Sequence, residues 1–426
     1  MSESDFKERN YFTDPSVLVD PYGYFEEMRQ KGPVVQLSTH DALLVNGFKE
    51  YLEVSLNTND WSAINGLAGS GTPLPFTPKG NDIGDQLESN RDKFIGHELV
   101  VCYDGKRHAN ARSLISRCFT PSRLKANEAF MQEYAEQLID QAVAKGKCEL
   151  MGDVATRFVT LVIADLLGVP SEDRVVFEEQ IAKGQTVGSI ENIDNPTAME
   201  SVYFIGGYMA KYLSERAENP GNDLMSELAT STFPDGSKPE MLELVTLATF
   251  LFVAGQDTSA KLLGNVIRYI CDEPGLQLKI RLDRELVPWV VEEVLRLEGS
   301  TKATHRLAVK DTTIGEQSVP AGTQAMLAIA GANRDPERWG RDAHEFQLKR
   351  PRIREHLAFG RGAHTCAGAP LARAEVITML NVMLDKTTEI RISERDHGKA
   401  GERKYPFEPS FIIRGLDHLY VELDPV

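Results

Sequence analysis

A long apolar stretch limits what this chain can fold into more than any other feature. It covers residues 239–271, repeats apolar residues at three- and four-residue steps, and is followed by Pro274. Its middle part, 247–254, is apolar on nearly all sides. Because a helix without a polar face has to be covered by other elements, we predict a long helix that runs through the core.

Helical periodicity also dominates the rest of the chain. It covers residues 20–31, 107–119, 123–145, 197–217 and 367–382. Strand patterns are shorter, at 34–37, 42–45, 307–309, 313–314, 323–328 and 419–423. The pattern predicts a mainly α fold with small β-sheets.

No internal repeat and no linker rich in Pro or Ser divides the chain. We therefore expect residues 1–426 to form one domain, with 1–19 as an N-terminal extension. Two irregular segments, 66–84 and 184–196, are either lids over a site or plain surface connections.

Composition and charge exclude several classes of protein. Hydrophobic residues make up 42% of the 426 residues, enough for a sizeable core, and the net charge of -16 argues against a general nucleic-acid binder. The first nine residues lack the apolar core of a signal peptide, and we expect no later stretch to stay apolar over the roughly 18 residues that span a bilayer. These features predict a cytoplasmic monomer without a nucleic-acid or membrane partner.

Five cysteines are scattered along the chain without any Cys-x-x-Cys pair, which fits neither a disulfide framework nor a structural zinc site. Cys102, Cys118, Cys148 and Cys271 are expected to be small buried hydrophobes. Cys366 differs because of its surroundings.

The segment from Phe359 to Gly368 reads Phe-Gly-Arg-Gly-Ala-His-Thr-Cys-Ala-Gly. Glycines at 360, 362 and 368 would let the backbone pass close to a flat macrocycle. A buried thiolate at Cys366 would be stabilised by backbone N–H groups at the start of the following helix, with Arg361 and His364 as nearby polar partners.

This segment is similar to the signature of the cytochrome P450 superfamily, with Ala367 where a leucine is common. The resemblance extends from Asp20 to Leu416 and implies a soluble bacterial-type haem-thiolate monooxygenase. It also implies the cytochrome P450 fold, with haem b (iron protoporphyrin IX) buried between the long central helix and the loop and helix that carry Cys366. The Cys366 thiolate would bind the iron, and its electron donation favours O–O cleavage.

A second motif, Ala254-Gly255-Gln256-Asp257-Thr258, resembles the oxygen-activation motif of the same family. Small Ala254 and Gly255 would leave room for O2 over the iron. The Thr258 hydroxyl is expected to bond a carbonyl one turn back and to loosen the helix there. Asp257 and Thr258 together suit a proton relay.

The resemblance also implies residues that hold the cofactor and the fold. Buried haem propionates need cationic partners, and the set expected here is His108, Arg112, Arg306 and His364, with Phe359, Gly360 and Gly368 against the ring. Glu293 and Arg296, three residues apart, would by spacing alone be a surface ion pair. They resemble a helix pair that supports the fold of the family and performs no chemistry.

Substrate and partners follow from the resemblance less directly. The expected pocket includes Phe252, Val253, Thr301, Ala303 and Phe411 and parts of 83–100. These residues are mostly apolar and favour a small lipophilic substrate. Lys302 either forms a polar edge of this pocket or faces solvent.

No reductase segment is fused, so the reaction with O2 would need a separate ferredoxin-type donor on the proximal face. The basic residues expected to attract it are Lys106, Arg107, Arg112 and Arg361. Two alternatives are a peroxide-driven peroxygenase and a non-enzymatic haem-thiolate sensor or carrier.

Overall fold

The computed structural model describes residues 9–181 and 200–426, so the segment 184–196 lies outside the described residues. The helices are α1 (Pro15–Val19), α2 (Tyr22–Lys31), α3 (Phe48–Leu56), α4 (Gly84–Ser89), α5 (Gly105–Cys118), α6 (Pro121–Lys145), α7 (Arg157–Leu167), α8 (Arg174–Ile181), α9 (Glu200–Glu218), α10 (Leu224–Ala229), α11 (Met241–Asp272), α12 (Leu276–Leu282), α13 (Val287–Glu298), α14 (Ile329–Ala332), α15 (Pro336–Trp339), α16 (Ala369–Lys386) and α17 (Glu394–His397). The prediction of a mainly α fold with small sheets is confirmed.

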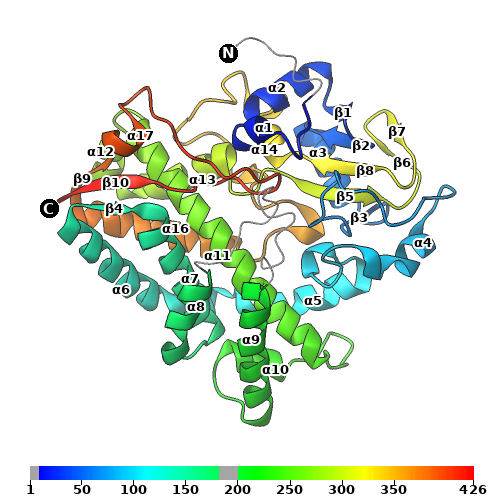
Figure 1. Cartoon of the computed structure of the whole chain (residues 1–426), viewed down its shortest axis with the longest axis horizontal. Coiled ribbons are helices and arrows are strands. Elements are labelled where there is room, and N and C mark those ends of the chain that lie inside the picture. Colours follow the sequence, from blue (N-terminus) through cyan, green and yellow to red (C-terminus); the bar gives the residue numbers. More distant parts are fainter. Residues whose placement is uncertain (1–8, 182–199) are drawn as a thin grey trace.

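The long apolar stretch forms α11, which crosses the molecule diagonally in Figure 1. It packs against α7, α9, α13 and α16, so that its apolar sides are covered by other helices. By its length and mean hydropathy alone, α11 is long and apolar enough to cross a membrane. The expectation that no stretch of the chain would be apolar over that length is therefore wrong. Because other helices pack around it, α11 is instead a helix of the protein core, as the sequence predicts.

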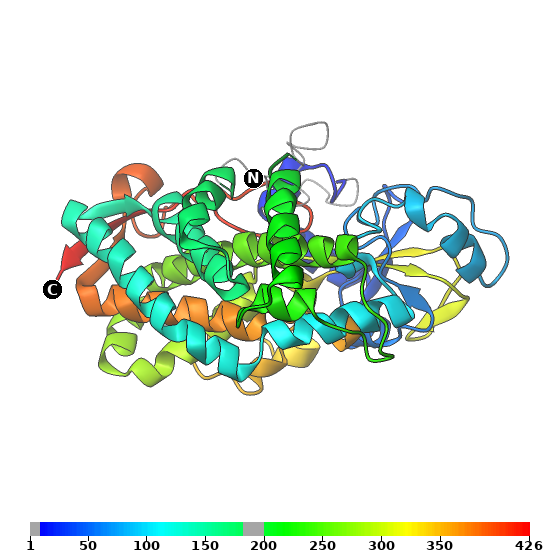
Figure 2. The same ribbon diagram turned by 90° about the horizontal axis from the view of Figure 1, so that it is seen from below.

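The strands gather mainly at one end of the molecule, in blue and yellow at the right of Figure 2. The largest sheet has the order β1-β2-β8-β5-β3, in which β2 and β8 are parallel and the other pairs antiparallel. A second sheet has the order β4-β10-β9, and β6 and β7 form a hairpin. The strands are β1 (Val34–Gln36), β2 (Ala42–Val45), β3 (Trp61–Ser62), β4 (Lys147–Glu149), β5 (Thr304–Ala308), β6 (Thr312–Ile314), β7 (Gln317–Val319), β8 (Gln324–Leu327), β9 (Thr387–Ile392) and β10 (Tyr420–Pro425).

The irregular segment 66–84 is fixed to this sheet at its start. The backbone N–H of Ser70 donates to Nδ1 of His305 in β5 at 3.1 Å. Gln324 in β8 donates from its side chain to the carbonyl of Thr72 at 2.9 Å. The first part of the segment is therefore a connection packed against strands.

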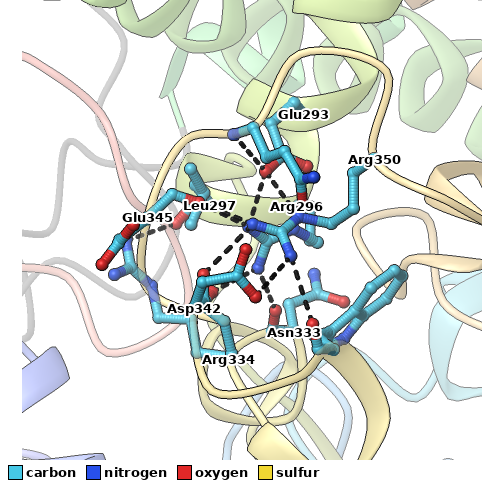
Figure 3. Close-up of polar contacts among 11 residues, drawn as sticks. Glu293, Arg296, Leu297, Asn333, Arg334, Asp342, Glu345 and Arg350 are labelled. Atoms are coloured by element: carbon cyan, nitrogen blue, oxygen red, sulfur yellow. Dashed lines mark hydrogen bonds and ion pairs between the residues drawn. The ribbon is translucent and has the colours of Figure 1, made fainter.

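A buried ion-pair network joins α13 to the loop that leads toward Cys366 (Figure 3). Arg296 Nη2 lies 2.7 Å from Glu293 Oε1, and both side chains are fully buried. Arg350, which the sequence patterns did not single out, adds its Nε at 2.9 Å from the same Glu293 oxygen. Arg296 also donates to the carbonyls of Asn333 and Ala343 at 2.8 and 2.5 Å. The pair is thus a buried ion pair that joins α13 to this loop, and not the surface ion pair that its spacing alone would predict.

Candidate active site

A cavity of about 320 Å³ lies between α5, α11 and the start of α16. Cys366 faces it from the loop before α16, and Ala254, Gly255 and Thr258 face it from α11. Most of the remaining wall is apolar, from Ile115, Phe119, Ile163, Phe250, Leu251, Leu262, Leu295, Ile329 and Leu371. The two sequence motifs therefore lie on walls of one cavity although they are more than a hundred positions apart.

The local backbone holds Cys366 in place. Its N–H donates to the carbonyl of Phe359 at 2.9 Å, and α16 begins three residues later at Ala369. Cys366 is exposed to the cavity, but desolvation by the protein packed around it raises the pKa of its thiol, while hydrogen bonds from the backbone of Gly368 and Ala369 and the charge of Arg112 act in the opposite direction. These donors are the ones that the sequence predicted for a thiolate at the start of a helix.

Two glycines of the loop, Gly360 and Gly362, have φ values of +67° and +78°. A Cβ at Gly362 would also lie 2.6 Å from the carbonyl oxygen of Ser55 in α3. The need for glycine at 362 therefore comes from a left-handed backbone packed against α3, and not from a cavity-facing surface as the sequence suggested.

Four nitrogen-bearing side chains gather at one side of the cavity. The rings of His108 and His364 have centroids 4.0 Å apart, and both line the cavity with Arg112. Arg306 is buried and does not line the cavity. Burial of His364, followed by the charge of Arg306, lowers the pKa of His364 to about 2. The four predicted propionate partners are thus brought together.

This cluster carries positive charge that lacks acidic partners. Within residues 9–181 and 200–426, neither Arg112 nor Arg306 forms an ion pair with a carboxylate. Buried guanidinium groups ordinarily have anionic partners, and two propionates would supply them. Phe359, Gly360 and Gly368 also line the cavity. The residues present therefore fit haem b.

Thr258 forms the predicted bond to the preceding turn of α11. Its Oγ1 donates to the carbonyl of Ala254 at 2.9 Å, and Ser300 donates to the carbonyl of Thr258 at 2.7 Å. α11 nevertheless stays α-helical through this turn, so the expected loosening of the helix is not seen. Ser300 had no signal in the sequence.

Asp257 is adjacent to Thr258 but is not among the residues that line the cavity. Its Oδ1 accepts from Lys261 Nζ at 2.6 Å, one turn further along α11. Lys261 also lies 2.7 Å from Glu408 Oε2. The four-residue spacing of Asp257 and Lys261 was a sequence signal for this contact, whereas Glu408 could not be found from spacing.

Known proteins resemble this chain over nearly its whole length. The sequence profile described as Cytochrome P450 matches residues 194–388. Cytochrome P450 144 of Mycobacterium tuberculosis is 30% identical over 97% of this chain and 91% of its own length. The chain belongs to the cytochrome P450 family.

Two further likenesses agree. Cytochrome P450 monooxygenase PikC of Streptomyces venezuelae is 29% identical over 94% of this chain and 90% of its own length. The substrate-free structure of Mycobacterium marinum cytochrome P450 CYP150A6 is 41% identical, with a TM-score of 0.92 over 99% of this chain and 100% of that one. This cytochrome P450 is an oxidoreductase of the monooxygenase type, and its cofactor is haem b.

The expected substrate residues of this P450 lie in different places. Thr301 lines the cavity. Phe252 is fully buried against Phe177, with ring centroids 5.1 Å apart, on the side of α11 opposite Ala254. Val253, Ala303 and Phe411 are also absent from the cavity wall. Of the segment 83–100, Val100 reaches it.

Lys302 corrects the sequence interpretation most clearly. It neither edges the cavity nor faces solvent, because it is fully buried and its Nζ donates to the carbonyl of Leu18 at 2.6 Å. Burial lowers the pKa of Lys302 well below its usual value. This lysine ties the start of the chain to the segment before β5.

Proposed function

We propose that this cytochrome P450 hydroxylates a small lipophilic substrate with O2, using electrons from a separate ferredoxin-type protein. One oxygen atom enters a C–H bond of the substrate, and the other leaves as water with two electrons and two protons. The observation that carries the proposal is the apolar cavity with Cys366 on one wall and Thr258 on another.

In this proposal Cys366 binds the haem iron, and His108, Arg112, Arg306 and His364 hold the propionates. When bound, the haem supplies the metal at which O2 is held and reduced. The uncompensated charges of Arg112 and Arg306 support this orientation, because two carboxylates would neutralise them. Phe359, Gly360 and Gly368 would contact the ring from the Cys366 side.

The chain itself supplies protons and space. Ala254 and Gly255 have no bulky side chain on the cavity face of α11, which leaves room for O2. The Thr258 hydroxyl, held by the Ala254 carbonyl, would pass a proton into the cavity, and Asp257 would replenish it.

A variant pair tests the role of Thr258. Thr258→Ala should keep haem and the thiolate-type spectrum but form less product per electron pair and more hydrogen peroxide. Thr249→Ala is the matched control, because Thr249 makes the same bond to the preceding turn, to Val245 at 2.7 Å, without lining the cavity. Unchanged yield in Thr258→Ala would refute the relay, and retention of the thiolate-type spectrum in Cys366→Ala would refute the ligand.

The substrate class follows from the wall of the cavity, which is largely apolar with hydroxyl groups at Ser259, Ser300, Thr301 and Thr304. Such a wall favours a lipophilic molecule with few polar groups over a charged metabolite. A screen of terpenoid, steroid-like and aromatic compounds for the low-spin to high-spin shift of the haem band would identify ligands. Preference for charged compounds in that screen would contradict this class.

The ferredoxin assignment rests on basic residues near the Cys366 loop. Lys106 lies 3.0 Å from Asp235, so part of its charge is already compensated, and Arg361 donates to the carbonyl of Arg354 at 3.0 Å. Arg361→Glu should therefore slow ferredoxin-driven turnover more than Lys106→Glu and reduce its salt dependence. Unchanged turnover in both variants would rule out these residues as the ferredoxin docking surface.

Two other functions make different demands on the same residues. A peroxygenase would form product with hydrogen peroxide alone and would not need Asp257 and Thr258 as a proton source. A haem-thiolate sensor or carrier would form no product with any electron donor. Turnover with peroxide alone, compared with turnover with reduced ferredoxin and O2, separates the three.

A further inference from the structure

A buried lysine lies between two carboxylates beside the proposed relay. The side chain of Lys261 is only 2% exposed, and its Nζ is 2.6 Å from Asp257 Oδ1 and 2.7 Å from Glu408 Oε2. The two acidic side chains are 29% and 23% exposed. A single interior cation is therefore held by two carboxylates on partly exposed side chains, although Asp257 Oδ2 and Glu408 Oε2 are themselves buried.

The strand-like segment 407–416 clamps this lysine against α11. Phe407 pairs with Leu416, and the N–H of Glu408 donates to the carbonyl of Gly415 at 3.1 Å. A Cβ at Gly415 would lie 2.6 Å from Cβ of Lys261 and closer still to its Cγ and Cδ. Glycine at 415 thus lets the backbone lie directly on the lysine stem, which limits where the ammonium group can go.

The packing of segment 407–416 on Lys261 also explains the direction of the Asp257 side chain. Successive residues of a helix are rotated by about 100°, so Asp257 and the cavity-facing Thr258 leave α11 in different directions. Lys261, one turn along, lies on the Asp257 side and holds that carboxylate toward Glu408 and the 407–416 segment. Lys261 therefore holds the Asp257 carboxylate in one direction instead of leaving it free to rotate.

The second carboxylate matters when Asp257 takes up a proton. A buried ammonium group that loses its anionic partner is strongly unfavourable. Glu408 would still compensate Lys261 at that moment, so Asp257 can be protonated without leaving an unpaired interior charge. A carboxylate paired with a lysine alone would lack this freedom.

From this geometry we infer that Lys261 and Glu408 are positioning residues that hold Asp257 at the solvent end of the proton relay. The inference rests on the proposed function. In each turnover two protons move from water by way of Asp257 and Thr258 to O2, which receives two electrons from the donor protein. One oxygen atom enters the substrate, and the other leaves as water.

The test uses the holoenzyme with its electron donor. Lys261→Met, which removes the charge at similar length, should lower product per electron pair by roughly three- to tenfold and raise the solvent deuterium isotope effect on product formation. Glu408→Gln should act in the same direction but less strongly. Lys279→Met is the matched control, since Lys279 is exposed on α12, and it should change neither quantity.

Two experiments distinguish a positioning role of Lys261 from a purely structural role. A purely structural role would not give both of the results described next. Asp257→Asn combined with Lys261→Met should be no worse in yield and isotope effect than Asp257→Asn alone, because both act through one carboxylate. A double-mutant cycle of these residues in urea unfolding of the holoenzyme should show coupling between them, independent of turnover.

The outcomes separate this inference from the proposed function. If Asp257→Asn leaves yield and isotope effect unchanged, the relay itself is wrong. If Asp257→Asn changes both but Lys261→Met and Glu408→Gln change neither, the positioning role is overturned and the relay stands. Should Lys261→Met not fold, Gly415→Ala keeps all three charges and displaces the lysine stem, and it should reproduce the loss of yield; a wild-type yield from it would overturn the inference.

Discussion

Arg112 Nη2 donates a hydrogen bond of 2.8 Å to the carbonyl oxygen of Thr365, the residue directly before Cys366. This bond ties α5 to the loop that carries the proposed iron ligand. The ring of His108, one turn earlier on α5, lies against the ring of His364 in the same loop. One helix face thus both fixes the ligand loop and brings a guanidinium group and an imidazole ring to the cavity.

Arg112→Met should make the protein release haem at least about tenfold faster. The variant loses a charge-assisted hydrogen bond to the loop and the proposed propionate partner, and such bonds contribute about 1.5–3 kcal/mol. The rate is measured by transfer of haem to excess apomyoglobin. Arg117→Met on the same helix is the control, because Arg117 donates to Ser231 and Thr232 instead. Equal rates in the two variants would contradict a haem-facing role for Arg112.

Arg296→Met should lower the free energy of unfolding by about 3–5 kcal/mol, the usual cost of removing one partner from a buried ion pair. Arg350 would remain as a partner of Glu293, but the backbone carbonyls of Asn333 and Ala343 would lose their donor. Urea unfolding followed by circular dichroism measures the change.

The control for that experiment is Arg284→Met. Arg284 pairs with Asp385 at 2.7 Å, but the two side chains are 36% and 65% exposed, whereas those of Glu293 and Arg296 are fully buried. Exposed pairs contribute about 1 kcal/mol or less. A similar loss in Arg284→Met and Arg296→Met would show that burial does not set the strength of the Glu293 pair.

Local periodicity predicted the elements that one segment determines by itself. The stretch 239–271 became α11 (Met241–Asp272), and 42–45 became β2. Strand β3 was missed because its two residues, Trp61 and Ser62, pair with Ala308 and Leu307 far along the chain. Two residues cannot show an alternating pattern, so only the partner strand reveals them.

The site residues divide in the same way, into those that a local motif identifies and those that depend on distant contacts. Cys366 and Thr258 were found because each lies in a short motif whose neighbours carry the signal. Phe252 was assigned to the substrate wall from the family resemblance, and the sequence could not correct this, because a helix that is apolar on nearly all sides does not show which side faces the cavity. Lys302 and Glu408 bind partners hundreds of positions away or across another element, which spacing cannot predict.

His305 in β5 provides a pH-dependent contribution to stability. It is fully buried, its Nδ1 accepts from the N–H of Ser70, and burial together with the charge of Arg306 lowers its pKa to about 3. In the unfolded chain this histidine has an ordinary pKa of about 6.5. Between about pH 6.5 and 3 it is therefore protonated in the unfolded chain but neutral in the folded protein. Stability contributed by neutral His305 is therefore complete above pH 6.5 and is lost as pH falls through that window.

His305→Asn should reveal this loss. The asparagine retains an acceptor for Ser70 but cannot titrate, so the stability deficit of the variant at pH 7 should shrink by about 2 kcal/mol at pH 5. Urea unfolding of both proteins at the two pH values measures the difference. His344→Asn serves as the control for replacing a histidine, because the His344 side chain is 69% exposed. A His305→Asn deficit that is the same at pH 7 and pH 5 would mean that the folded protein protonates His305 as readily as the unfolded chain does.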